Sequence, residues 1–208
     1  MKRGSTVNKI SEFLLENDKF KDVSNFAPIV IAPGRFNPPH RGHKLIIDKL
    51  VALSEKLDAQ PVVLIIDSGK YGPKNPLSGE VRKEYLQKMF PELRIEVFRN
   101  AFEAVVELAQ NDRLVPIGGV AGQDRGNAYK GMIGQIFGDD IRKRYLSEVI
   151  HRNPDSDSTD IKGISATRAR QAAVEGDVAA FRAMTGFADE EAKTLMNLLV
   201  DGMETNGI

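Results

Sequence analysis

Short apolar runs alternate along the chain with longer segments whose apolar residues recur at helical spacing. The run from Val62 to Ile66 is continuously apolar, as expected of a parallel strand covered on both faces. Similar runs predict strands at 28–33, 62–66, 94–98, 114–120 and 146–150, with helices at 44–51, 79–90, 101–110 and 127–137 between them. This alternation predicts an α/β fold built on a doubly wound, five-stranded parallel sheet.

The two ends of the chain lie outside this alternation. Residues 5–17 carry apolar residues at helical spacing, which predicts an amphipathic helix suited to packing or to contact with a second copy in a homo-oligomer. Two further helical patterns follow the sheet, at 178–184 and 189–203. We therefore divide the chain into an N-terminal helical extension (1–25), an α/β domain (26–175) and a C-terminal helical appendage (176–208).

Composition narrows the classes of partner. The 29 basic and 29 acidic residues cancel, so no overall field recruits nucleic acid or an anionic membrane, and any affinity for phosphate must be local. Cysteine is absent, which excludes disulfides and thiolate nucleophiles. No apolar run approaches the ~18 residues of a membrane span, and the N-terminus lacks the apolar core of a signal peptide. We expect a cytoplasmic protein with neither a nucleic-acid nor a membrane partner.

Two of the three histidines lie in one short loop between the first strand and the first helix. Residues 34–43 read Gly-Arg-Phe-Asn-Pro-Pro-His-Arg-Gly-His. Gly34 lets the backbone turn and approach a ligand, and Gly42 allows His43 to be presented near the helix start, where free amides favour an anion. Imidazoles donate hydrogen bonds and can become cationic near neutral pH. The loop therefore predicts a phosphate-binding site.

Other interpretations of the two histidines stay open at this point. A histidine at a strand-to-helix turn is often only a cap or a packed side chain. A His-x-x-His pair can also be half of a zinc site, but zinc usually takes three or four protein ligands. With no cysteine and only His151 left, carboxylates would have to complete the shell, so we predict no metal held by protein side chains.

A second motif near the end of the α/β domain has similar chemistry. Residues 163–172 read Gly-Ile-Ser-Ala-Thr-Arg-Ala-Arg-Gln-Ala. Ser165 or Thr167 can cap a helix that begins here, which brings amides, hydroxyls and guanidiniums together at a positive helix end. The segment predicts a second phosphate-binding element, and the alternative is an ordinary cap with surface arginines.

The two motifs together resemble the paired signatures of the nucleotidyltransferase superfamily with the His-x-Gly-His motif, the cytidylyltransferase-like enzymes. The resemblance covers residues 28–175 and implies a Rossmann-like sheet. Ala166 stands where that family commonly has a second serine. The wording Gly-Arg-Phe-Asn-Pro-Pro-His, with the loop Gly-Gln-Asp-Arg at 122–125, looks closest to nicotinamide-mononucleotide adenylyltransferases of the compact archaeal and phage-like type.

The resemblance implies a reaction in which a phosphate oxygen of an acceptor attacks the α-phosphorus of ATP and releases pyrophosphate. With nicotinamide mononucleotide as acceptor the product is NAD. The implied partners are ATP and a phosphorylated small-molecule acceptor, with Mg²⁺ bound to the nucleotide. The residues expected to act are His40, His43 and Arg170 in catalysis; Gly34, Arg35, Phe36, Asn37, Gly42, Ser165, Thr167 and Arg168 on ATP and its phosphates; and Asp67, Lys70, Gly122, Asp124 and Arg125 on the acceptor.

Other activities fit the same signatures. Phosphopantetheine and flavin-mononucleotide adenylyltransferases and CTP-dependent cytidylyltransferases share both motifs, and a non-catalytic nucleotide-binding regulator could keep them. Class I aminoacyl-tRNA synthetases share the His-x-Gly-His motif on a related fold. They would also need an anticodon-binding domain and usually a basic Lys-Met-Ser-Lys-Ser-like loop, neither of which these 208 residues contain.

Overall fold

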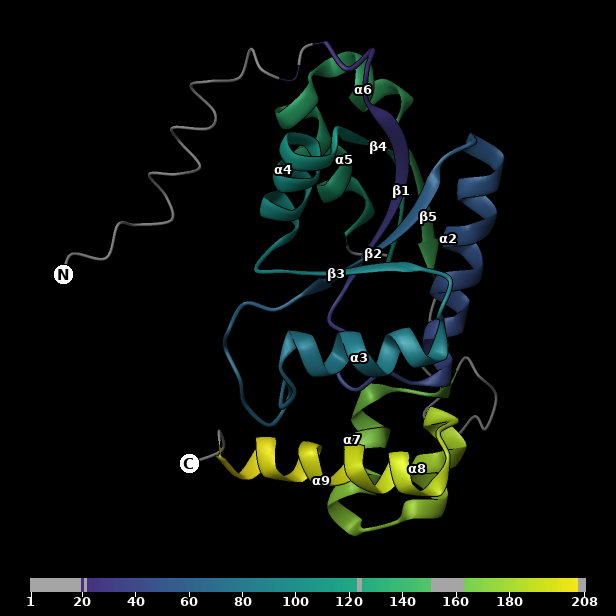
Figure 1. Cartoon of the computed structure of the whole chain (residues 1–208), viewed down its shortest axis with the longest axis vertical. Coiled ribbons are helices and arrows are strands. Elements are labelled where there is room, and N and C mark those ends of the chain that lie inside the picture. Colours follow the sequence, from purple (N-terminus) through teal and green to yellow (C-terminus); the bar gives the residue numbers. More distant parts are fainter. Residues whose placement is uncertain (1–19, 21, 123–124, 151–162, 206–208) are drawn as a thin grey trace, which may run out of the picture.

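Five parallel strands form one sheet in the order β3-β2-β1-β4-β5 (Figure 1). The structure is a computed structural model, and it describes residues 20, 22–122, 125–150 and 163–205. The strands are β1 (Ala27–Gly34), β2 (Gln60–Ile66), β3 (Arg94–Phe98), β4 (Leu114–Gly122) and β5 (Leu146–Ile150). The chain reverses its direction across the sheet between β1 and β4, so ligands are expected at the carboxyl ends of these two strands. The predicted doubly wound, five-stranded parallel sheet is confirmed.

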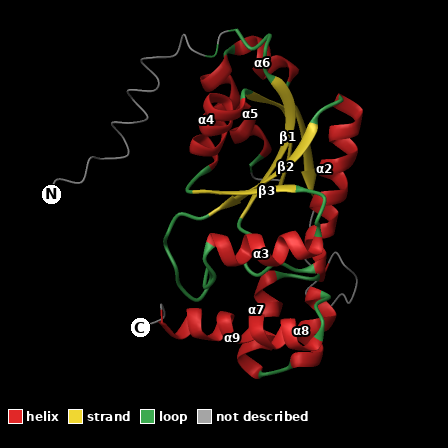
Figure 2. Cartoon of the chain, viewed as in Figure 1, coloured by secondary structure: helices red, strands yellow, loops and turns green. Residues whose placement is uncertain are grey.

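Helices cover both faces of the sheet, which explains why its central strands are continuously apolar (Figure 2). Along β1, Ile29 and Ile31 face α4 (Ala101–Asp112) and α5 (Gly126–Phe137). Val30 and Ala32 face the opposite way. On that side lie α2 (Lys44–Leu57) and α3 (Gly79–Met89). The alternating side chains of each strand thus divide the core into two apolar layers.

Among the described residues, one α-helix was not predicted, and neither was the short 3-10 helix at Arg41–His43. The six residues of α6 (Asp139–Arg144) lie between α5 and β5, and five of them are charged. Only Ile141 is buried. A single apolar residue has no periodicity, so the sequence carries no helical pattern there.

The C-terminal helices form a third apolar cluster beyond α3 (Figure 1). The helices α7 (Ala166–Glu175), α8 (Val178–Thr185) and α9 (Asp189–Thr205) pack around Phe181 and Leu195. The helical patterns predicted at 178–184 and 189–203 are confirmed, whereas the helix predicted at 5–17 lies outside the described residues. The proposed division into domains stays a prediction. Within the described part of the chain, no helix combines the length and the apolar character needed to cross a membrane.

Candidate active site

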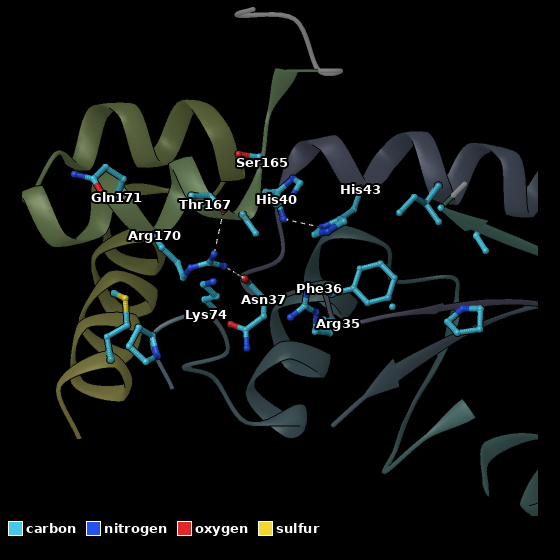
Figure 3. Close-up of a pocket in the computed structure, with 18 of the residues that line it drawn as sticks. Arg35, Phe36, Asn37, His40, His43, Lys74, Ser165, Thr167, Arg170 and Gln171 are labelled. Carbon is cyan, nitrogen blue, oxygen red and sulfur yellow. Dashed lines mark hydrogen bonds between the residues drawn. The ribbon is translucent and has the colours of Figure 1, made fainter. Parts of the chain in front are cut away.

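The loop between β1 and α2 faces the start of α7 across a cleft of about 620 Å³ (Figure 3). We call it the histidine cleft. Its walls come from that loop, from the end of β4, from α7 and from Lys74 in the loop between β2 and α3. The cleft therefore lies at the carboxyl ends of β1 and β4, where the strand order reverses.

Phe36 shapes the first part of the loop. Its φ angle of 50° lies in the left-handed region, and its side chain is only 3% exposed. A Cβ atom at Gly34 would lie 2.6 Å from the Phe36 ring, so the glycine is needed for this close approach. The Phe36 ring meets the His43 ring edge-on, with centroids 4.8 Å apart. The turn at Gly34 and Phe36 thus helps to position the side chain of His43, a candidate catalytic residue.

The two histidines are buried side by side. Their rings stack with centroids 3.7 Å apart, and the side chains of His40 and His43 are 3% and 5% exposed. The backbone N–H of His40 donates to Nδ1 of His43 over 3.1 Å (Figure 3). Because Nδ1 accepts this hydrogen bond, a neutral His43 carries its proton on Nε2. The geometry makes Nε2–H a hydrogen-bond donor for a ligand.

Arg170 joins the two sequence motifs. From α7, its Nη1 donates to the backbone carbonyl of Asn37 over 2.7 Å, and its Nη2 donates to Oγ1 of Thr167 over 3.2 Å (Figure 3). Burial lowers the pKa of Arg170, and the positive charge of Arg35 lowers it further. Two guanidiniums that repel each other across a cleft favour an anion between them.

Ser165 is the N-cap residue of α7. Its Oγ accepts a hydrogen bond from the backbone N–H of Arg168 over 3.3 Å, which is an N-cap interaction. The predicted helix start at this motif is confirmed. The cap places the positive end of the α7 dipole at the histidine cleft, where it favours an anion.

A second cleft, of about 720 Å³, adjoins the first, and we call it the tyrosine cleft. Pro33, Gly34, Arg35 and Gly122 line both clefts. The tyrosine cleft is completed by Ile66, Ser68, Asn75, Arg125, Tyr129 and Ile150. Arg35 is exposed and is the one charged residue among the described residues shared by the two clefts. A ligand in either cleft would therefore meet the same guanidinium.

The histidine cleft brings together nine of the residues predicted to act on the nucleotide: Gly34, Arg35, Phe36, Asn37, His40, His43, Ser165, Thr167 and Arg170. Gly42 and Arg168 do not line it. At Gly42 a Cβ atom would lie 2.9 Å from His40 Nδ1 and 3.0 Å from the Ile164 carbonyl oxygen, so this glycine serves close packing.

The residues predicted for the acceptor are more scattered. Gly122 and Arg125 line the tyrosine cleft, and Asp124 lies outside the described residues. Asp67 and Lys70 line neither cleft. The Asp67 carboxylate accepts hydrogen bonds from the Gly79 amide over 2.5 Å and the Tyr71 hydroxyl over 3.0 Å.

Burial alone would raise the pKa of Asp67. Hydrogen bonds from the amides of Gly69 and Gly79 and the charge of Arg82 outweigh that effect, so the pKa lies below its ordinary value. This carboxylate is therefore ionised and already engaged within the protein.

Several residues of the two clefts were not expected there from the sequence. Lys74 and Gln171 line the histidine cleft, as does Met203 of α9, and Tyr129 lines the tyrosine cleft. Lys74 lies in a polar loop, and Met203 lies in a helix beyond both motifs, so no spacing connects them to the site. For Lys74, its place after the second strand was the only available indication.

A family model described as cytidylyltransferase-like matches residues 31–175, which include both motifs. No curated protein sequence matches the chain.

Two solved structures resemble the fold. One is a Plasmodium falciparum nicotinic acid mononucleotide adenylyltransferase complexed with APC, at 15% identity and a TM-score of 0.52, with 84% of this chain and 98% of that chain covered. The other is a Streptococcus pneumoniae macrolide-efflux protein, at 18% identity and a TM-score of 0.51. That match covers 80% of this chain but only 58% of the other. At such identities the two likenesses show the fold alone.

The family model spans more than two thirds of the chain and contains the residues of both motifs that line the histidine cleft. The chain therefore belongs to the cytidylyltransferase-like family of nucleotidyltransferases.

Proposed function

We propose that this nucleotidyltransferase transfers AMP from ATP to the phosphate of a mononucleotide, with nicotinamide mononucleotide as the first choice, giving NAD and pyrophosphate. The observation that carries the proposal is the meeting of two clefts at Arg35. One cleft is lined by donors suited to a triphosphate, and the other has room for a second nucleotide-sized molecule.

The histidine cleft is proposed to hold ATP. His43 would donate from Nε2 to the α-phosphate, where charge grows in the transition state, and His40 would act near the bridge to the departing pyrophosphate. Ser165, Thr167 and Arg170 would bind the β- and γ-phosphates, with Arg170 offering a planar, forked set of donors. Lys74, exposed on the facing wall, would add a further positive charge for the same phosphates.

The tyrosine cleft is proposed to hold the acceptor. Its phosphate would lie against Arg35, and Tyr129 would offer an aromatic face to the ring of the base. An acceptor phosphate oxygen then forms a bond to the α-phosphorus while the bond from phosphorus to the bridging oxygen breaks, and pyrophosphate leaves. The attacking oxygen is already anionic, so positioning and charge neutralisation are sufficient without a strong base.

Mg²⁺ is proposed to enter with the nucleotide. The described residues that line the two clefts include no carboxylate, and the described residues form no cluster of three or more His, Asp or Glu suited to a metal. This donor set fits an ion held by phosphate oxygens and water. The bound ion would neutralise phosphate charge, while Arg35, Arg170 and Lys74 would hold the phosphates themselves.

A substrate panel tests the proposal. ATP and CTP are each mixed with nicotinamide mononucleotide, nicotinate mononucleotide, phosphopantetheine, flavin mononucleotide and glycerol phosphate, and pyrophosphate release is measured. We expect the highest kcat/KM with ATP and nicotinamide mononucleotide. Activity only with CTP, or only with another acceptor, would replace the proposed substrates. Binding of ATP without any pyrophosphate release would favour a non-catalytic nucleotide-binding regulator. The His43→Ala variant provides the background rate of pyrophosphate release.

A further inference from the structure

Arg82 is a charged residue that the proposed reaction leaves without a role. It lies in α3, its side chain is 0% exposed, and it lines neither cleft. Burial lowers the pKa of Arg82, and the charge of Asp67 opposes that shift. A guanidinium is costly to bury unless its donors are paired, so its partners indicate what it does.

The guanidinium connects three segments of the backbone. Nη1 donates to the carbonyl of Arg35 over 2.5 Å and to that of Ile66 over 3.1 Å. Nε donates to the carbonyl of Ser78 over 3.1 Å, and Nη2 lies 3.2 Å from the Asp67 carboxylate. Arg82 thus ties the loop after β1 to the end of β2 and the start of α3.

The Arg35 carbonyl is the important one of these acceptors. This carbonyl belongs to the peptide group that joins Arg35 to Phe36. The φ angle of Phe36 is 50°, which is unfavourable for any residue other than glycine. A hydrogen bond from a fixed, buried donor holds this peptide in that orientation. The orientation directs the Phe36 ring against the ring of His43, and Arg35 itself extends to both clefts.

We propose that Arg82 is a positioning residue for nucleotidyl transfer. Through the peptide between Arg35 and Phe36, it holds the Arg35 side chain and the His43 imidazole where the transferring phosphate reacts. This inference rests on the proposed function. Lysine cannot replace it, because one ammonium group cannot reach acceptors that a planar guanidinium spans.

The first test compares Arg82→Lys with the wild-type full-length chain. We expect kcat for pyrophosphate release to fall about 10- to 100-fold, as for a displacement of catalytic groups by about 1 Å, and KM for ATP to change less than threefold. Lys83→Met is the matched control, because its ammonium pairs with Glu96 away from both clefts. A wild-type kcat in Arg82→Lys, or an equal loss in Lys83→Met, would overturn the inference.

A second variant covers the case in which Arg82→Lys does not fold. Arg82→Gln combined with Asp67→Asn removes both charges and leaves amide groups that can bond to each other. We expect the same loss of kcat in this folded double variant. A wild-type kcat there would overturn the positioning role, because the backbone carbonyls would have lost the guanidinium without consequence.

Coupling to Phe36 separates positioning from general stability. If Arg82 acts through the Phe36 ring, then adding Arg82→Lys to Phe36→Leu should lower kcat by less than threefold beyond Phe36→Leu alone. A purely structural role predicts that the two losses multiply. Multiplicative losses would therefore contradict the part of the inference in which Arg82 positions His43 through the Phe36 ring.

A spectroscopic measurement separates this inference from the proposed function. The imidazole nitrogen resonances of His43, identified by their absence in His43→Ala, should shift in Arg82→Lys and remain in place in Lys83→Met. Unchanged resonances would overturn the positioning role, whatever reaction the protein catalyses. Lack of pyrophosphate release by the wild type, together with a His43 shift in Arg82→Lys, would overturn only the proposed function.

Discussion

The two motifs that meet in the histidine cleft are held in very different ways. The loop at 34–43 buries four side chains, those of Phe36, Asn37, His40 and His43. The buried guanidinium of Arg82 also donates a hydrogen bond to the backbone carbonyl of Arg35 in this loop. At the start of α7, by contrast, Thr167 is exposed and Ser165 and Arg170 are only half-buried. Phe36 of the loop packs in the apolar cluster that covers one face of the sheet, whereas α7 packs in the C-terminal helical cluster.

This difference matches the proposed roles of the two motifs, in which the loop acts on the α-phosphate and α7 binds the β- and γ-phosphates. Stabilising the charge that grows on a transferring phosphorus requires donors that do not reorganise during the reaction, and the buried loop satisfies that requirement. Pyrophosphate must be bound and then released, which suits the less buried groups of α7 on a separate helical cluster. We therefore expect changes in the loop to act mainly on kcat, and changes in α7 to act mainly on the affinity for ATP.

The largest effect is expected from His43→Ala. The change removes the Nε2–H donor at the α-phosphate and should lower kcat by roughly 100-fold or more, with little change in the dissociation constant for ATP. Steady-state pyrophosphate release and calorimetric ATP titration measure the two quantities. Lys44→Ala is the control. Lys44 follows His43 in the chain, but its exposed ammonium group pairs with Asp48, so this variant should keep the wild-type kcat. A near-normal rate in His43→Ala would remove His43 from its proposed role.

Gly34→Ala should come next. The new methyl group would lie 2.6 Å from the Phe36 ring, which must then move away from His43. Overpacking of this kind costs about 1–3 kcal/mol of the free energy of unfolding, and we expect kcat to fall about tenfold as His43 loses its support. Gly131→Ala in α5 is the control, since nothing lies within 4 Å of its new Cβ atom. An unchanged kcat in Gly34→Ala would show that the loop tolerates displacement of the ring.

Arg170→Lys tests the other side of the cleft. Lysine cannot bridge the Asn37 carbonyl and the Thr167 hydroxyl while also binding phosphate, so we expect ATP to bind about tenfold more weakly. The effect on kcat should be smaller than the effect on affinity. Arg182→Lys on α8, where the native arginine pairs with Asp189, should leave both unchanged. Equal affinities for ATP in Arg170→Lys and the wild type would contradict the assignment.

The sequence was a good guide where function depends on local pattern. Apolar runs such as Val62 to Ile66 predicted the sheet, because a strand covered on both faces must be apolar throughout. The two motifs likewise predicted which segments would meet, although residues 37 and 170 are far apart in the chain. Periodicity accounts for the sheet, whereas the resemblance to the paired signatures of the nucleotidyltransferase superfamily accounts for the expectation that the two motifs act together.

Long-range packing accounts for what the sequence did not predict. Asp67, which was predicted to bind the acceptor, instead pairs with Arg82 of α3, and Arg82 is fully buried. Nothing in their spacing indicates that pairing, because it depends on how α3 packs against the ends of β1 and β2. Met203 reaches the cleft for a similar reason, through the packing of α9.

The smallest effect separates the fold of α7 from its proposed role. Ser165→Ala removes the Oγ that accepts from the Arg168 amide, which should lower the free energy of unfolding by about 1 kcal/mol and weaken ATP binding a few-fold. Asp177→Ala removes the equivalent cap of α8, where the carboxylate accepts from the Ala180 amide over 2.9 Å. Both variants should lose similar stability in chemical denaturation, but only Ser165→Ala should lose affinity for ATP. Equal affinities in the two variants would mean that Ser165 serves the helix alone, and the binding of the outer phosphates would then depend on Thr167 and Arg170.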